Sequence, residues 1–405
     1  MSVVVLIGIM CFWLFSPEAL TLIGNGAGLG STAFTLMLVF SASLVAAGIL
    51  LPGRGCHLDS MAGDSPLAGW PGVSYVLGFS AISGTALFAS TGMLVSAGFT
   101  FNEVFFYRFP NFSFSSLLLF LVVVLHQLPA RMAAFLQGAL VLLTMCCLVV
   151  LVVAGIIGNP SEPAASRAGA VAPLSSLLPL LLVFAGFEQS FLRRGTKVFS
   201  SRVLLCFLGA VTVLICWGIV SAKFAAGERL VSSSIPYMQA ASGILGQKGR
   251  MVMGIAVISG SCAAVNGLFG LSSSYLARVA GDGWNGFIIR GMPLILALAV
   301  GGLWLMGVAG SRNLELYIRA SLLLWLLYGG VMLVAGERSA DRHALMKNAP
   351  ARIVGCLLIL SSVLMAWFYG HYRAMGLFFV GLLTGTTLCI MVVSLMHGRN
   401  ASERR

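Results

Sequence analysis

The chain has 405 residues, of which 59% are hydrophobic and only 9% are charged. Soluble domains carry about a quarter of their residues as charged side chains, so this composition excludes a soluble globular protein. Apolar runs of roughly 18–25 residues recur along the whole length, and each is long enough to cross a bilayer. The net charge of +12 therefore belongs to membrane topology and anionic lipid rather than to a nucleic-acid groove.

The sequence predicts an all-α integral membrane protein with about twelve transmembrane helices. With the N-terminus inside, most of the 24 basic residues fall in inner loops and in the tail, as the positive-inside rule requires. An even number of spans leaves both termini in the cytoplasm. The first apolar run begins without a basic region, so we predict no cleavable signal peptide. The predicted spans are 3–22, 30–51, 72–98, 113–129, 132–157, 174–192, 203–222, 252–276, 291–310, 315–335, 353–369 and 375–397.

The first span carries a proline and a carboxylate, Pro17 and Glu18, in its second half. Proline removes an internal hydrogen bond and clashes with the preceding turn, so the helix is expected to kink or unwind near Ser16. The alternative is a helix that ends at Ser16 and is followed by an interfacial turn. The residues expected at this break are Phe12, Trp13, Leu14, Phe15 and Ser16.

The sixth span contains the run Phe184-Ala185-Gly186-Phe187-Glu188. A charge near the bilayer centre costs at least about 3 kcal/mol, and glycine weakens a helix by about 1 kcal/mol. Both are tolerated together where a helix is broken to line a cavity, as in carriers. Breaks in spans one and six predict a five-plus-five inverted repeat in one domain, 1–405. Its parts are 1–157, 174–335 and two additional helices in 353–397.

Three further features bear on function. Asn266 is a polar residue in the eighth span, where it either faces spans one and six or bonds to a neighbouring helix. The apolar stretch Tyr237–Leu245 predicts a short surface helix, either a lid or a plain interfacial helix. Glu315 and Arg319 are four apart and are expected to pair. The nine cysteines and five histidines show no pairing or metal-ligand spacing, so we predict no disulfide, metal or cofactor.

The run Phe184–Glu188 and the eighth-span stretch Ala264-Val265-Asn266-Gly267, which leads to Ala280-Gly281-Asp282-Gly283, carry a family resemblance. They resemble the amino acid–polyamine–organocation transporter superfamily. The part from Leu314 to His397 looks most like bacterial exporters of methionine and branched-chain amino acids. The resemblance implies a leucine-transporter-like fold in the bacterial cytoplasmic membrane. It also implies secondary active transport and an amino-acid or small-amine substrate.

The departures from that superfamily leave several properties open. Met10, Cys11 and Phe12 stand where permeases carry Gly-x-Gly, which lets backbone N–H groups approach a carboxylate. Ser274 stands where an arginine is expected, and the fifth span has no lysine. The substrate, the direction of transport and the coupling ion, H⁺ or Na⁺, therefore stay open.

We predict a secondary active transporter working by alternating access, with hydrophobic amino-acid efflux as one form. The alternative is a transport-inactive permease-like scaffold or sensor. An intramembrane enzyme is disfavoured, because no catalytic cluster is evident. Glu188 could shape the break, bind an ammonium or take up a proton, or it could simply cap the second half-helix. The predicted substrate-binding residues are Phe12, Trp13, Leu14, Phe15, Ser16, Phe184, Ala185, Gly186, Phe187, Glu188 and Asn266.

Overall fold

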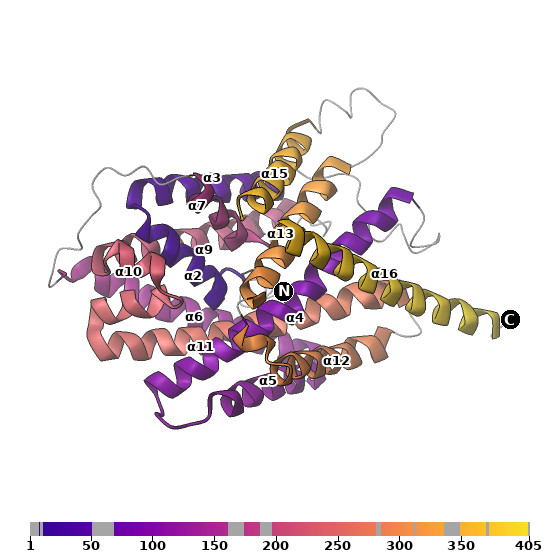
Figure 1. Cartoon of the computed structure of the whole chain (residues 1–405), viewed down its shortest axis with the longest axis horizontal. Helices are drawn as coiled ribbons and strands as arrows, with labels where there is room; N and C mark the ends of the chain where they lie inside the picture. The colour runs from indigo at the N-terminus through magenta and orange to yellow at the C-terminus, as the bar shows by residue number, and fades with distance from the viewer. Residues whose placement is uncertain are drawn as a thin grey trace. The chain divides into compact units, whose positions relative to one another are not determined.

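A computed structural model describes residue 8 and residues 11–50, 69–160, 174–186, 197–280, 285–311, 313–335, 349–369 and 372–403. Within these ranges every regular element is a helix (Figure 1). Eight helices are long and apolar enough to cross a membrane, and three shorter apolar helices accompany them. The prediction of an all-helical membrane protein is confirmed at this level. Twelve spans and an inverted repeat remain predictions.

The chain divides into two compact units, and each gathers segments that are distant in sequence. The first unit comprises Met1–Leu50, Met93–Ser190 and Gly195–Gly267, and the second comprises Leu51–Gly92, Phe191–Arg194 and Leu268–Arg405. Two long helices, α4 (Gly69–Val104) and α11 (Pro236–Ala280), contribute to both units. The predicted repeat boundaries stay predictions.

The first unit is built around the short helix α2, whose inner residues Ala19, Leu20 and Ile23 are completely buried. Helix α2 lies against α3, α9, α10 and the 3₁₀ helix η2 (Figure 1). Helix α6 packs against α9 and runs beside α11 (Figure 1). The bounds are α2 (Pro17–Gly28), α3 (Ser31–Leu50), α5 (Asn111–Gln127), α6 (Ala130–Ile157), α7 (Leu174–Leu177), η2 (Leu178–Phe184), α9 (Lys197–Phe224) and α10 (Gly227–Ser232).

Polar contacts lie both between and within the helices of the second unit. Tyr75 donates to the carbonyl of Tyr275, whose hydroxyl in turn bonds to that of Tyr328. The predicted pair forms, since Arg319 donates to Glu315 on the same helix. The bounds here are α12 (Asn285–Leu305), η3 (Val308–Gly310), α13 (Asn313–Ala335), α15 (Ala349–Phe368) and α16 (Tyr372–Glu403).

One predicted boundary is wrong, because helical structure after the first break continues to Gly28, six residues beyond the predicted end of the span. The expected short helix Tyr237–Leu245 forms the part of α11 before its kink, and the predicted span 252–276 lies in the part after it. Leu245 and Gly246 interrupt α11 with non-helical backbone, and Gly246 takes a left-handed φ of 59°. Glycine adopts that conformation without steric cost, so two helices meet there at a kink rather than across a loop.

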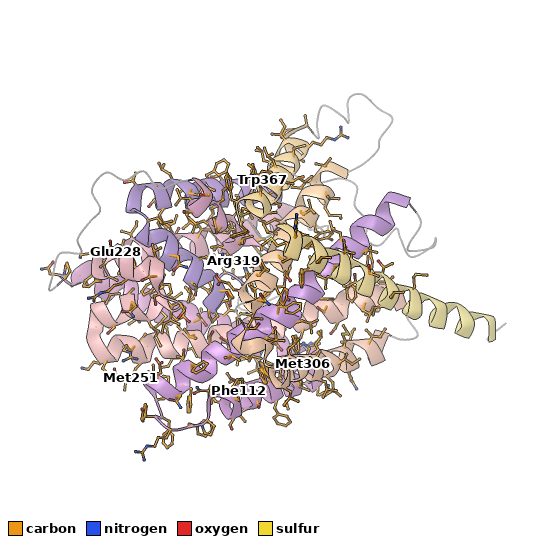
Figure 2. All side chains as sticks on the ribbon, viewed as in Figure 1. Phe112, Glu228, Met251, Met306, Arg319 and Trp367 are labelled. Atoms are coloured by element: carbon orange, nitrogen blue, oxygen red, sulfur yellow. The ribbon has the colours of Figure 1, made fainter. Side chains whose placement is uncertain are left out.

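Large apolar side chains cover the outside of both units. Figure 2 marks Phe112 and Met251 in the first unit, with exposed fractions of 51% and 43%. Met306 and Trp367 in the second unit are exposed by 79% and 75% (Figure 2). Such surfaces are unfavourable in water, whereas they match the lipid hydrocarbon of a bilayer.

The contact between α2 and α10 depends on two glycines. A Cβ added at Gly227 would lie 2.6 Å from the carbonyl oxygen of Gly28, whereas one added at Gly209 would meet nothing within 4 Å. Overpacking costs about 1–3 kcal/mol, so Gly227→Ala is expected to lower the melting temperature of the purified protein by several degrees. Gly209→Ala, in the middle of α9, is expected to leave it unchanged or raise it slightly. Equal shifts in thermal unfolding would contradict the close approach.

Candidate substrate site at two interrupted helices

The first helix of the chain is interrupted between Gly8, which is helical, and Pro17, where α2 begins. Residues 11–16 form turns and bends. Ser16 caps α2, because its hydroxyl oxygen accepts the backbone N–H of Ala19 at 3.2 Å. Pro17 stands at the first helical position, where its missing N–H costs nothing. The interruption that the sequence predicted near Ser16 is therefore present.

The side chains at this interruption are enclosed in the first unit. Phe12, Trp13, Leu14 and Phe15 expose 4%, 2%, 0% and 1% of their surface, and Ser16 exposes none. Phe12, the one of these residues that the sequence placed where a glycine was expected, lies with its ring against Gly267. The hydroxyl of Ser16 is used as a helix cap, which gives this residue a structural role in the conformation described.

A second break in helical backbone, called the second interruption below, follows η2. Helical structure ends at Phe184, the backbone of Ala185 is non-helical, and Gly186 adopts a left-handed φ of 94°. Phe184 and Ala185 are completely buried, and the ring of Phe184 meets that of Phe207 edge-on at 5.7 Å. Phe187 and Glu188 lie outside the described residues. The predicted end of the sixth-span helix is present, and its continuation is not described.

A hydrogen bond joins the two interruptions. The indole Nε1 of Trp13 donates to the carbonyl oxygen of Leu182 at 3.2 Å, although the residues are 169 positions apart. The same carbonyl accepts the N–H of Ala185 at 3.2 Å. The indole of Trp13 thus adds a second hydrogen bond to a carbonyl that already accepts one from its own chain, since a carbonyl oxygen has two lone pairs.

Helix α11 approaches the first interruption closely at two glycines that are two turns apart. A Cβ at Gly260 would lie 2.5 Å from the carbonyl oxygen of Phe15, and one at Gly267 would lie 2.6 Å from Cγ of Phe12. Any larger residue would push the interrupted segment away from the helix. The small residues of α11 therefore set the position of residues 12–15.

Asn266, which the sequence placed in the site, is buried and donates from Nδ2 to Oε1 of Gln137 at 2.7 Å. Gln137 lies on α6, and its Nε2 donates to the carbonyls of Gly8 at 3.2 Å and of Ala263 at 2.8 Å. Sequence reasoning missed Gln137. The available signal was an isolated amide in the strongly apolar helix Ala130–Ile157.

A second polar contact joins α6 to α11 two turns from the first. The hydroxyls of Thr144 and Ser259 lie 2.8 Å apart. No group of three His, Cys, Asp or Glu side chains able to hold a metal ion occurs among the residues that the structure describes. The described part of the site therefore offers aromatic surface, hydroxyl and amide groups and backbone carbonyls.

The fold is shared with solved membrane transporters. A manganese transporter from Eremococcus coleocola, in complex with an aromatic bis-isothiourea compound, superposes with a TM-score of 0.56 at 14% identity. The match covers 98% of this chain and 94% of that one. Two variants of that transporter, one with a histidine replaced by alanine and one with a glutamate replaced by glutamine, give TM-scores of 0.52 and 0.53. Each is 12% identical, and the matches cover 97% of this chain and 93% of theirs.

No known family model matches the sequence, and no curated protein matches it either. The likeness in structure extends over nearly the whole chain and defines the class of protein, a multi-pass membrane protein with a transporter fold. The identity is too low to carry more than the fold.

The bond between Trp13 and Leu182 can be tested against a matched tryptophan. Trp217 is also completely buried in the first unit, but its Nε1 has no partner among the described residues. Trp13→Phe and Trp217→Phe remove similar apolar volume, and only the first removes a hydrogen bond of about 1 kcal/mol. We expect Trp13→Phe to lower the melting temperature in detergent by about 2–4 °C more than Trp217→Phe. A larger effect at Trp217 would show that the indole bond does not hold the two interruptions together.

Proposed function

We propose that the protein is a secondary active transporter that moves an amino acid or related small amine across the cytoplasmic membrane of a bacterium by alternating access. The observation that carries the proposal is the hydrogen bond from Trp13 to Leu182, which brings two interrupted helices to one place. Carriers of several folds bind their substrates near the bilayer midplane where helices are discontinuous. The transporter fold shared with the solved structures supports the same class.

The chemistry around the interruptions favours a substrate with an apolar side chain. Unpaired N–H groups at a helix start suit a carboxylate, and carbonyls at a helix end suit an ammonium. Phe12, Phe15 and Phe184 supply aromatic surface beside those backbone groups. The resemblance to exporters of methionine and branched-chain amino acids supports efflux of a hydrophobic amino acid. In this proposal both termini lie in the cytoplasm.

Manganese is the cargo named for the structural neighbours, and the donor set argues against it for this chain. Divalent manganese prefers carboxylate, carbonyl and water oxygens. Residues 11–16 carry no carboxylate, histidine or methionine, and neither do residues 178–186. Glu188, just beyond the second range, is one carboxylate, and its single charge would not balance a dehydrated divalent cation. An amino acid, which brings both of its own charges, fits these surroundings better.

A second candidate is a scaffold or sensor that keeps the fold without transport. It is favoured by Phe12, whose ring packs on Gly267 and occupies space that a glycine would leave open. Flux separates the candidates, because a scaffold binds without moving substrate. Proteoliposomes preloaded with unlabelled methionine, leucine or isoleucine should accumulate the labelled amino acid by counterflow. Absence of counterflow for all three, with binding retained, would favour the scaffold.

Glu188 is proposed to take part in transport from just beyond the second interruption. A hydrogen bond to a charged group contributes about 1.5–3 kcal/mol, so Glu188→Gln is expected to lower counterflow by about tenfold or more. Glu228→Gln is the matched control, since Glu228 is an exposed carboxylate on α10 (Figure 2). Unchanged flux and pH dependence in Glu188→Gln would leave that carboxylate only a structural capping role.

A further inference from the structure

The carboxamide of Gln137 occupies a position between three elements of the first unit. Its nitrogen donates one bond to the carbonyl of Gly8, a helical residue that precedes the turns and bends at residues 11–16, and one to that of Ala263 on α11. Its oxygen accepts from Asn266. Gln137 is only 6% exposed, so no bulk water competes for these bonds.

This arrangement has one chemically sensible orientation. Two carbonyl oxygens face the nitrogen, which has two hydrogens to donate, and an amide donor faces the oxygen. Exchanging the oxygen and nitrogen of Gln137 would set its oxygen against two carbonyl oxygens. At Nε2 the carbonyl oxygens of Gly8 and Ala263, which carry partial negative charge, therefore converge on amide hydrogens, which carry partial positive charge.

Converging backbone carbonyls at the end of a half-helix are where discontinuous-helix carriers coordinate a coupling cation. Gly8 supplies such a carbonyl, because the chain leaves the helix before residue 11. Ala263 supplies the second from a neighbouring helix, and the amide oxygen of Asn266 is a third potential ligand once Gln137 is removed. Here the tethered amide nitrogen takes the place of the ion.

We propose that Gln137 is a built-in, neutral substitute for a coupling cation at this position, so that the transport cycle draws no sodium ion here. The inference rests on the proposed transport function and adds to it that a sodium gradient is not the energy source. Substrate transport is then driven by a gradient other than that of sodium, or by exchange for another substrate, without a sodium requirement at the first interruption. Gln137 is a positioning residue, because it acts on the interrupted helix and not on the substrate.

The transport test compares counterflow in sodium chloride with counterflow in choline chloride at equal ionic strength. Wild-type counterflow is expected to be the same in both salts. A fall in choline chloride of tenfold or more would overturn the proposal. If no amino acid shows counterflow in either salt, the proposed substrate is wrong, and the binding test below still decides the role of Gln137.

The binding test uses thermal unfolding of the purified protein and needs no transport. Gln137→Ala leaves the carbonyls of Gly8 and Ala263 without their donor and opens space for an ion, so sodium should raise its melting temperature relative to choline. A rise of about 2–4 °C at saturating sodium is expected, and none in the wild type. Thr144→Ala is the control, because it removes a polar contact of the same two helices two turns away. Its melting temperature should be lower in both salts alike.

Absence of a sodium-specific rise in Gln137→Ala would overturn the proposal. If Gln137→Ala does not fold, Gln137→Lys and Gln137→Met replace it. Lysine keeps a donor for the two carbonyls, whereas methionine has a similar length and no donor. A folded lysine variant beside an unfolded methionine variant supports the substitute-cation role. Equal folding of the two variants contradicts it.

Discussion

An interrupted helix in an apolar bundle must have its exposed backbone groups paired, and the first unit depends on that constraint. A polar group left unpaired away from water costs several kcal/mol, and lipid offers no partners. Three side chains form such bonds here. The hydroxyl of Ser16 caps the start of α2, the indole N–H of Trp13 donates to the carbonyl of Leu182, and the amide of Gln137 donates to the carbonyl of Gly8. These bonds determine where the interrupted segment lies, so the candidate site is a product of hydrogen-bond pairing as much as of packing.

Helices α6 and α11 form the frame against which that segment is held. Hydrogen bonds at two levels join them, one through Gln137 and one through Thr144. Next to those levels α11 presents Gly260 and Gly267, whose lack of a side chain leaves room for the chain at Phe15 and Phe12. Polar bonds thus fix the distance between the two helices, and glycines leave the space that the interrupted segment fills.

Local chemistry explains why part of this site was predictable. Pro17 and Gly186 act on their own backbone, so the interruptions near Ser16 and after Phe184 could be read from the sequence. The partners of Trp13 and Gln137 lie more than a hundred residues away, and no periodicity identifies them. The kink in α11 was predictable only in part. The short helix expected at Tyr237–Leu245 ends at the kink, but only Leu245 and Gly246 separate it from the following helix, where the sequence suggested a longer connection.

Sharing a fold with a manganese transporter does not determine the cargo, because the same fold can carry different donor sets. In this chain the indole of Trp13 and the amide of Gln137 already donate to backbone carbonyls that a bare cation would need as ligands. Under the proposed function, an amino acid with an apolar side chain and charged ends displaces Trp13 and fills the volume that the ring vacates. The burial of the aromatic residues then corresponds to a closed resting conformation whose contacts the ligand replaces.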